Sequence, residues 1–415
     1  MSRALVIGGS LGGLIAAHML RRAGWNTAVF ERNDEELASR GVGLGTHPQL
    51  IAVLRRAGIK FDESMGLTPS RAACLDRDGK ILFERPTART LSGWSRLYRA
   101  LLDGLPPQTC RFGKRLVHVE QDARSVTAVF ADGTRESGAL LVGADGIRSA
   151  VRAQFLPDIE PIYAGYVAWR AVLDEADVPP DIWREVFDLY AFCLPEGEQL
   201  ISYAVPGRDN DTKVGRRAYN IVWYRPVDHD ELVDISTDAA GRHHANGIPP
   251  PLIRRDVIAR VKADARTLIA PKIAEIFVRT APFFQPIYDL ASPRLVFGRA
   301  VLAGDAAFVA RPHAGAGTTK AALDGACLAD SISSADGDLA SRLARYERMQ
   351  QPFGRALVDL NREEGAYLSA QIKPKAERSA AELSRDPGAV VHAHIARSDQ
   401  VGRVVVAYGL AELAV

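Results

Sequence analysis

The chain has 415 residues, a length that predicts two or three domains of about 150 residues each, or one large composite domain. Its charges nearly cancel, since 52 Lys and Arg stand against 50 Asp and Glu, and hydrophobic residues make up 47% of the chain. This balance excludes an intrinsically disordered chain, a collagen-like chain and a tail protein that binds polyanions.

The start of the chain contains a glycine-rich turn between two strands. Residues 3–7 form a short apolar run that predicts a buried parallel strand, and Gly8-Gly9-Ser10-Leu11-Gly12-Gly13 follows it. Apolar residues at helical spacing predict a helix over 14–23, and a second strand over 26–30 ends in Glu31-Arg32. Strand, glycine turn, helix, strand and acid in this order are typical of a dinucleotide-binding fingerprint.

Each part of this fingerprint has a physical role. Gly8 permits the tight turn, Gly13 lets helix and strand pack closely, and the helix N-terminus offers N–H groups to a pyrophosphate. Ser10 replaces the middle glycine of G-x-G-x-x-G, but its side chain is small enough for a phosphate to approach. Glu31 is expected to accept hydrogen bonds from ribose hydroxyls and to repel a 2′-phosphate, which disfavours NADP. NAD and FAD both remain candidates, and the alternative is a glycine turn without a nucleotide.

Two later segments carry further glycine and aspartate motifs. Alternating residues over 115–130 and a run over 139–142 predict strands, and the second leads into Gly143-Ala144-Asp145-Gly146-Ile147-Arg148-Ser149. A strand over 300–303 leads into Gly304-Asp305-Ala306-Ala307. Arg311-Pro312-His313-Ala314-Gly315-Ala316-Gly317 then precedes a helix that is predicted over 318–328. Taken singly, these motifs are explained as a helix cap at Asp145, a capped turn and loop glycines.

Together the three motifs resemble those of the flavoprotein aromatic hydroxylases, single-component FAD monooxygenases with a GxGxxG, a DG and a GD motif. The resemblance covers residues 3 to about 331 and is greatest to the 2,6-dihydroxypyridine 3-hydroxylase group, which shares the 8–13 turn, the stretch 163–170 and Arg311-Pro312-His313. It implies an α/β fold: a Rossmann-like FAD-binding domain, an inserted, mainly antiparallel β-sheet substrate domain and a C-terminal helical segment. The expected boundaries are 1–70, 96–158 and 286–335 for the FAD-binding domain, 71–95 and 159–285 for the substrate domain, and 336–415 for the C-terminal segment.

The resemblance implies that residues of all three motifs bind FAD. Asp305 would hold the ribityl hydroxyls, and N–H groups at Gly315 and Gly317 would face the N1/C2 carbonyl edge of the isoalloxazine. Asp145 and Arg148 would touch FAD and the passing nicotinamide. The full expected set is Gly8, Ser10, Leu11, Gly12, Gly13, Glu31, Arg32, Arg40, Gly45, Asp145, Arg148, Gly304, Asp305, Pro312, Gly315, Ala316 and Gly317. Relatives often carry an Arg where this chain has Trp94, and Arg96 or Arg40 is the expected replacement.

Aromatic residues gather between residues 163 and 224. Strand-like runs over 163–172, 190–194, 200–205 and 219–224 predict an antiparallel sheet. The aromatic residues of this region are Trp169, Trp183, Tyr190, Phe192, Tyr203, Trp223 and Tyr224. An aromatic wall would bind a small ring and keep water from a reactive oxygen adduct, although most aromatic residues of strands build the core.

The activity that the resemblance implies is hydroxylation of a small hydroxylated aromatic or N-heteroaromatic ring. NADH or NADPH would reduce FAD as a transient co-substrate, since the chain has no second glycine fingerprint, and O2 would form a flavin C4a-hydroperoxide. The base that ionises the ring hydroxyl is expected among His47, His313, Tyr203 and Tyr224; His47 is slightly favoured because it follows the 43–45 turn. Alternatives are an oxidase or halogenase-like enzyme on a larger substrate, or a non-catalytic FAD-binding module.

Other sequence patterns limit the classes of binding partner and the cellular compartment that are expected for the protein. The four cysteines lie far apart without a C-x-x-C pair, and His243 and His244 are adjacent, so neither a disulfide framework nor a metal site is expected. Glycines interrupt the apolar run 4–20, and no other run approaches the length of a membrane span, which predicts a cytoplasmic protein without membrane or nucleic-acid partners. A long helix is expected over 338–373 with a kink at Pro352. The tail 386–415 is expected to dock on the body or on a second subunit of a homodimer.

Overall fold

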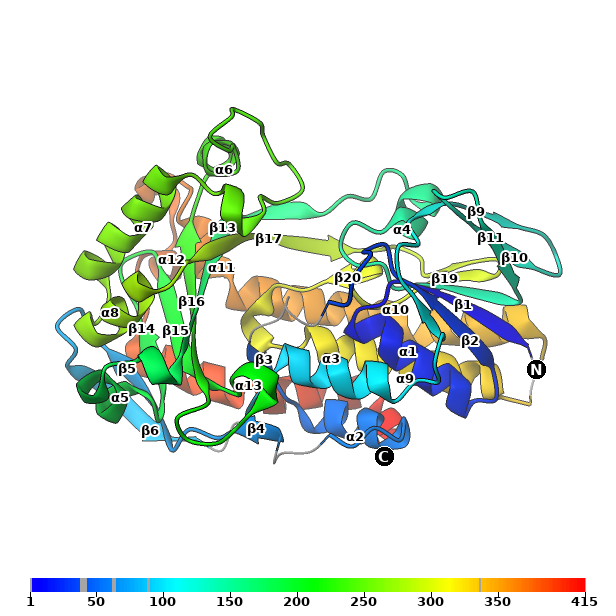
Figure 1. The fold of residues 1–415 in the computed structure, drawn as a ribbon, viewed down its shortest axis with the longest axis horizontal. Coiled ribbons are helices and arrows are strands. Elements are labelled where there is room, and N and C mark those ends of the chain that lie inside the picture. The colour runs from blue at the N-terminus through cyan, green and yellow to red at the C-terminus, as the bar shows by residue number, and fades with distance from the viewer. Residues whose placement is uncertain (1, 38–42, 62–64, 88–89, 336, 415) are drawn as a thin grey trace.

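The computed structural model describes residues 2–37, 43–61, 65–87, 90–335 and 337–414. Figure 1 shows two halves side by side, each built on a sheet, with long helices of the last third of the chain crossing the middle of the view. The N-terminal strands lie in the half that carries the N-terminus. Both sheets contain strands that are far apart in sequence, so the chain passes between the halves several times.

A six-stranded sheet in the order β18-β19-β12-β1-β2-β8 forms the core of the first half. Its strands are β1 (Arg3–Ile7), β2 (Asn26–Phe30), β8 (Cys110–Arg111), β12 (Leu140–Gly143), β18 (Val296–Phe297) and β19 (Ala300–Leu302). All of them pair in parallel except β18, which is antiparallel to β19. The strands β1, β12 and β19 are almost wholly buried, as is usual for parallel strands covered on both faces. Because parallel strands end at the same edge, the three motifs that follow β1, β12 and β19 come together there.

Helices α1 (Leu11–Arg22) and α9 (Gly317–Ser333) pack against each other on this half. Gly325 of α9 lies so close to α1 that an added Cβ would be 3.1 Å from the Ala16 Cα. Small residues therefore allow the two helices to approach closely. Smaller elements surround this core: α2 (Pro48–Arg56), α3 (Trp94–Asp103), α4 (Ala150–Phe155), a sheet of β9 (Leu116–Gln121), β10 (Val126–Phe130) and β11 (Arg135–Gly138), and a sheet of β3 (Gly43–Gly45), β4 (Gly66–Leu67) and β7 (Leu91–Gly93).

An eight-stranded sheet in the order β20-β17-β13-β16-β15-β14-β5-β6 forms the second half. Its strands are β5 (Arg71–Leu75), β6 (Ile81–Pro86), β13 (Ile162–Asp174), β14 (Leu189–Cys193), β15 (Gln199–Val205), β16 (Ala218–Pro226), β17 (Phe283–Ala291) and β20 (Phe308–Val309). All neighbours are antiparallel except β14 and β5. The expected α/β fold with a mainly antiparallel second sheet is confirmed. The expected boundary at 285/286 falls inside β17, because this strand pairs with β13 along both parts of its length.

The two faces of the eight-stranded sheet separate its aromatic residues, because successive side chains of a strand point to opposite faces. Trp169 and Trp223 lie on the face covered by α5 (Pro180–Val186), α7 (Arg255–Leu268) and α8 (Pro271–Arg279). The Trp223 ring centroid is 5.6 Å from that of Phe277 in α8. The opposite face carries Tyr166, Tyr190, Tyr203 and Tyr224. The two tryptophans therefore build core, and the tyrosines face the other half.

The C-terminal segment folds back along both halves. α10 (Leu339–Glu364) contains Pro352 but ends well before residue 373, the expected end, and α11 (Ala366–Ala370) follows. Between them, a Cβ on Gly365 would lie 2.8 Å from His313 Nε2 and from Tyr166 Oη, so the chain is pressed against these side chains. α13 (Pro387–Ala407) packs on β5 and β6 of the same chain. The tail thus docks on the body.

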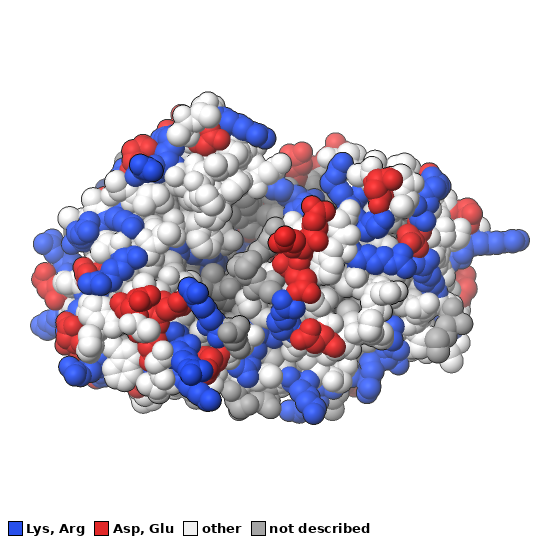
Figure 2. All heavy atoms as spheres, viewed as in Figure 1, with Lys and Arg blue, Asp and Glu red and all other residues white. Residues whose placement is uncertain are grey.

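The face drawn in Figure 2 carries Lys and Arg interspersed with Asp and Glu, and it is hollowed between the two halves. Among the residues that the structure describes, no helix is both long and apolar enough to cross a bilayer. Within the same described ranges, no three His, Cys, Asp or Glu side chains gather as a metal site requires.

Candidate functional site

The turns that follow β1, β2 and β12 enclose a groove of about 460 Å³, the first groove. Gly8 has a φ of +109°, and an added Cβ would lie 2.3 Å from the Ala144 carbonyl oxygen. A Cβ on Gly13 would lie 1.9 Å from the Gly8 carbonyl oxygen. No side chain caps α1, so its first N–H groups stay open. Bare backbone, free N–H groups and a groove of this kind fit the pyrophosphate of a dinucleotide.

Glu31 lies at the end of β2 on the wall of the first groove and is only 5% exposed. Its Oε2 accepts the Gly9 N–H at 2.9 Å, and its Oε1 accepts the Asn33 N–H at 3.0 Å. A Cβ on Gly9 would lie 2.8 Å from the Glu31 Cβ, so the glycine turn and the acid are packed against each other. Glu31 therefore holds the turn in place besides facing the position expected for a ribose.

Asp145 and Arg148 also line the first groove. Asp145 accepts hydrogen bonds from Ser149 Oγ at 2.5 Å and from the Ala150 N–H at 2.7 Å, so it secures the start of α4. Burial raises the pKa of Asp145, and these hydrogen bonds oppose the shift. Arg148 donates to the Ala245 carbonyl at 3.0 Å and to Asn246, which ties the first groove to a loop of the other half.

A second groove of about 280 Å³ lies between the tyrosine face of the eight-stranded sheet and the segment 305–318. The sheet contributes Tyr190, Tyr203 and Tyr224 to its lining, and the segment contributes Asp305, Pro312, His313, Gly315, Gly317 and Thr318. The Asp305 side chain is exposed at this groove. No side chain caps α9, and a Cβ on Gly317 would meet nothing within 4 Å, so open space lies in front of its N-terminal N–H groups. This arrangement fits a polar ring edge and a hydroxyl-bearing chain.

A buried ion pair of α9 holds the Gly304-Asp305 turn. Lys320, 1% exposed, donates from Nζ to the Gly304 carbonyl at 2.7 Å and to Asp324 Oδ2 at 3.0 Å. The Gly304 N–H donates to the same Asp324 oxygen at 2.7 Å. Both backbone groups of Gly304 are thereby fixed, and with them the direction of Asp305. The sequence signal for this pair is a Lys and an Asp four residues apart in a helix rich in alanine and other small residues.

We expect Lys320→Met to lower the free energy of unfolding by about 3 to 5 kcal/mol, because Asp324 would be left as a buried unpaired charge. The double variant Lys320→Met/Asp324→Leu removes both charges and should recover most of this stability. It still lacks the bonds to Gly304, so it should bind the expected FAD more weakly than the wild type. Urea unfolding and FAD titration of the two variants test this. Wild-type stability of the single variant would contradict it.

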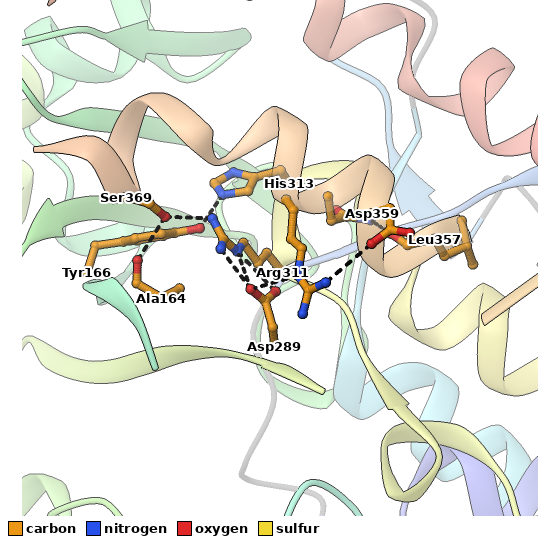
Figure 3. A network of polar contacts seen from close by, with 10 residues as sticks. Ala164, Tyr166, Asp289, Arg311, His313, Leu357, Asp359 and Ser369 are labelled. Carbon is orange, nitrogen blue, oxygen red and sulfur yellow. Dashed lines mark hydrogen bonds and ion pairs between the residues drawn. The ribbon is translucent and has the colours of Figure 1, made fainter. Parts of the chain in front are cut away.

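A network of polar contacts fixes the turn that carries Pro312 and His313 (Figure 3). His313 Nε2 lies 2.6 Å from Tyr166 Oη. Arg311 donates to both oxygens of Asp289, from Nε at 3.0 and 3.1 Å and from Nη2 at 2.7 Å, and both side chains are buried. Arg311 Nη1 also donates to Ser369 Oγ at 2.6 Å. Burial raises the pKa of Tyr166, so its hydroxyl stays protonated. β13, β17 and α11 thus converge on this turn.

The four expected proton acceptors fall into two groups. Tyr203, Tyr224 and His313 line the second groove. His47 is 0% exposed and is not among the described residues that line this groove. Its Nδ1 lies 2.9 Å from Thr319 Oγ1 of α9. His47 is the residue directly before α2, and its ring is buried against the first turn of α9.

Neither arginine that was expected to replace the cation at Trp94 is found beside it in the described residues. Trp94 lines the first groove and stacks on Tyr98, with ring centroids 5.0 Å apart. Arg96 donates to the Asn210 carbonyl and lines a different concavity, so it does not take this place. Arg40 lies outside the described residues. An aromatic side chain, Trp94, therefore lines this part of the first groove.

The chain is similar in sequence to known FAD-binding proteins and monooxygenases. A family model described as FAD binding domain-like matches residues 163–289. The 2,6-dihydroxypyridine 3-monooxygenase of Paenarthrobacter nicotinovorans is 33% identical over 364 residues, which cover 86% of this chain and 89% of that protein. The 6-hydroxynicotinate 3-monooxygenase of Pseudomonas fluorescens is 27% identical over 341 residues, covering 79% and 81%.

Solved structures show the same architecture. The 2,6-dihydroxypyridine-3-hydroxylase from Arthrobacter nicotinovorans has a TM-score of 0.82 at 30% identity and covers 93% of this chain and 98% of its own. Klebsiella pneumoniae HpxO complexed with FAD and uric acid has a TM-score of 0.69 at 23% identity, covering 99% and 96%. This second likeness is one of fold alone.

Proposed function

Because the chain belongs to the flavoprotein aromatic hydroxylases and is therefore an FAD-dependent monooxygenase, we propose that it hydroxylates a small hydroxylated aromatic or N-heteroaromatic ring with NADH or NADPH and O2. The second groove carries this proposal, since three tyrosines of the sheet face His313 and the open start of α9 across it. This groove of about 280 Å³ would have to hold the edge of the isoalloxazine as well as the substrate, which favours one small ring over a large substrate. Two relatives are named for hydroxylated pyridines.

The cofactor follows the three motifs in this proposal. The Gly8–Gly13 turn would hold the pyrophosphate, and Glu31 and Arg32 would hold the adenosine ribose. Asp305 accepts hydrogen bonds from the ribityl hydroxyls, and the N–H groups at the start of α9 face the electron-rich edge of the isoalloxazine. FAD, when bound, supplies the activation of O2. Pro312 has no N–H to donate beside it.

The groove residues prepare the ring for electrophilic attack in this proposal. The hydroxyls of Tyr203 and Tyr224 orient the ring by hydrogen bonding, and the wall of tyrosines shields one side of the ring from water. His313 accepts the proton of a ring hydroxyl, because a histidine is the side chain that changes charge near neutral pH. An ionised hydroxyl makes the ring electron-rich.

The test is turnover of the purified yellow holoenzyme with NADH or NADPH, ¹⁸O-labelled O2 and a panel of hydroxypyridines, hydroxynicotinates and phenols. We expect one labelled oxygen atom in the product for each nicotinamide oxidised, with the second atom released as water. Substrate oxidation that yields stoichiometric hydrogen peroxide and no labelled product would indicate an oxidase. Bound flavin that NADH and NADPH never reduce would indicate a non-catalytic module, and either result overturns the proposal.

A further inference from the structure

Arg170 is the only Lys or Arg among the described residues that line the second groove. It lies in β13 on the same face as Tyr166 and Ala168, because side chains of a strand alternate between faces. Val222 of β16 stands opposite Arg170, and Ile201 of β15 stands opposite Val222. A cation therefore interrupts an apolar row on the wall of the groove.

The guanidinium of Arg170 is anchored at one end. Its Nε donates to Gln285 Oε1 of β17 at 2.6 Å. Within the described part of the chain, no other hydrogen bond and no ion pair involves Arg170, so its two terminal NH2 groups keep their donors for a ligand. Charge attraction is stronger in a groove walled by tyrosine and aliphatic side chains than in water. The anchored fork is thus a site for an anion.

We propose that Arg170 selects substrates that present a planar anion with two adjacent acceptor atoms, an inference that rests on the proposed function. A guanidinium fork donates two parallel hydrogen bonds to two such acceptors at once, whereas a group with one acceptor oxygen cannot accept both in this way. A ring carboxylate offers two oxygens in this arrangement. The ionised edge of a 2-hydroxy N-heteroaromatic ring offers its oxygen and the ring nitrogen in a similar arrangement. A phenol offers one oxygen only.

Under this proposal Arg170 and His313 have different roles in the groove. Arg170 holds the ring by its anionic edge, whereas His313 lies in the turn beside the start of α9. Binding the anion at Arg170 favours the ionised form of the substrate, which raises the electron density of the ring. The substrate class is therefore a hydroxylated N-heteroaromatic ring or a hydroxylated ring carboxylate, ahead of a simple phenol.

The test is ligand affinity, measured by calorimetry under anaerobic conditions with the oxidised holoenzyme and without NADH or NADPH. Two matched pairs of probes separate the two sources of the anion. 2,6-Dihydroxypyridine and 1,3-dihydroxybenzene differ in the ring nitrogen, and 6-hydroxynicotinate and 6-hydroxynicotinamide differ in the carboxylate. We expect the first member of at least one pair to bind about 10- to 100-fold more tightly than the second, as a charge-assisted hydrogen-bonded pair predicts.

Arg170→Met should abolish that preference, and Arg170→Lys, which keeps the charge without the fork, should retain only a small part of it. Val222→Ala is the matched control in the same row, and it should weaken all four probes alike. The proposal is overturned by a wild type without preference in either pair, by a preference that survives in Arg170→Met, or by a uniform loss like that of Val222→Ala. Binding is measured without turnover, so this test does not depend on the reaction. If Arg170→Met abolishes the preference of the wild type but the wild type oxygenates no ring, the role of Arg170 stands and only the proposed function is overturned.

Discussion

Gly13→Ala is expected to yield a protein that purifies without bound FAD and shows no NADH or NADPH oxidation. The new methyl group would lie 1.9 Å from the Gly8 carbonyl oxygen. A change of side-chain rotamer moves neither the Cβ nor the backbone oxygen, so it cannot relieve this clash. α1 would have to move away from β1, and the turn that is expected to hold the pyrophosphate would move with it. Overpacking of this kind costs about 3 kcal/mol or more.

Flavin absorbance of the purified protein and thermal unfolding with and without added FAD measure this effect. Gly402→Ala is the matched control, because it makes the same change in helix α13. An added Cβ there would meet only the flexible end of Gln49, at 3.3 Å. It should stay yellow and unfold near the wild-type temperature. A yellow Gly13→Ala protein with wild-type stability would show that the close contact of Gly13 with the Gly8 carbonyl does not constrain the glycine turn.

The sequence predicts the first half of the molecule well because its signals are local. β1, the glycine turn, α1 and Glu31 are contiguous, and each segment has the pattern of its element. The two later motifs are placed by one general rule, that parallel strands end at a common edge. β12 and β19 pair in parallel beside β1, so Asp145 and Asp305 follow strands of the same edge.

The sequence predicts the walls of the second groove less well, because they depend on contacts between distant segments. The place of His47 after β3 predicts a position at the groove, whereas its ring is buried and contacts Thr319 of α9, far away in the sequence. α10 ends at Glu364, and the next residue, Gly365, lies against the side chains at positions 166, 311 and 313, a contact that no local pattern reveals. Period-two alternation on β13 could have placed Arg170 on the face of Tyr166.

Replacing His313 by glutamine is expected to lower kcat by about 100-fold or more, the usual contribution of a general base. Glutamine keeps a polar side chain in the groove wall but cannot take up a proton. A base must be unprotonated to act, so wild-type kcat should fall as the pH is lowered and the base takes up a proton. This acid limb should be absent from the pH profile of His313→Gln. KM should change little, because the ring is held by other groups.

Tyr166→Phe separates positioning from proton transfer. Tyr166 is fully buried and reaches His313 through one hydrogen bond of 2.6 Å, so its loss should leave the base present but poorly oriented. We expect kcat to fall by about 10-fold, the usual effect of removing one hydrogen bond to a reacting group. The acid limb of the kcat–pH profile should be retained but should lie at a different pH. Tyr203→Phe is the control on the opposite wall and should raise KM more than it lowers kcat. If His313→Gln keeps the acid limb of the wild type, the proton acceptor is not His313, and the tyrosines of the sheet become the groups to test.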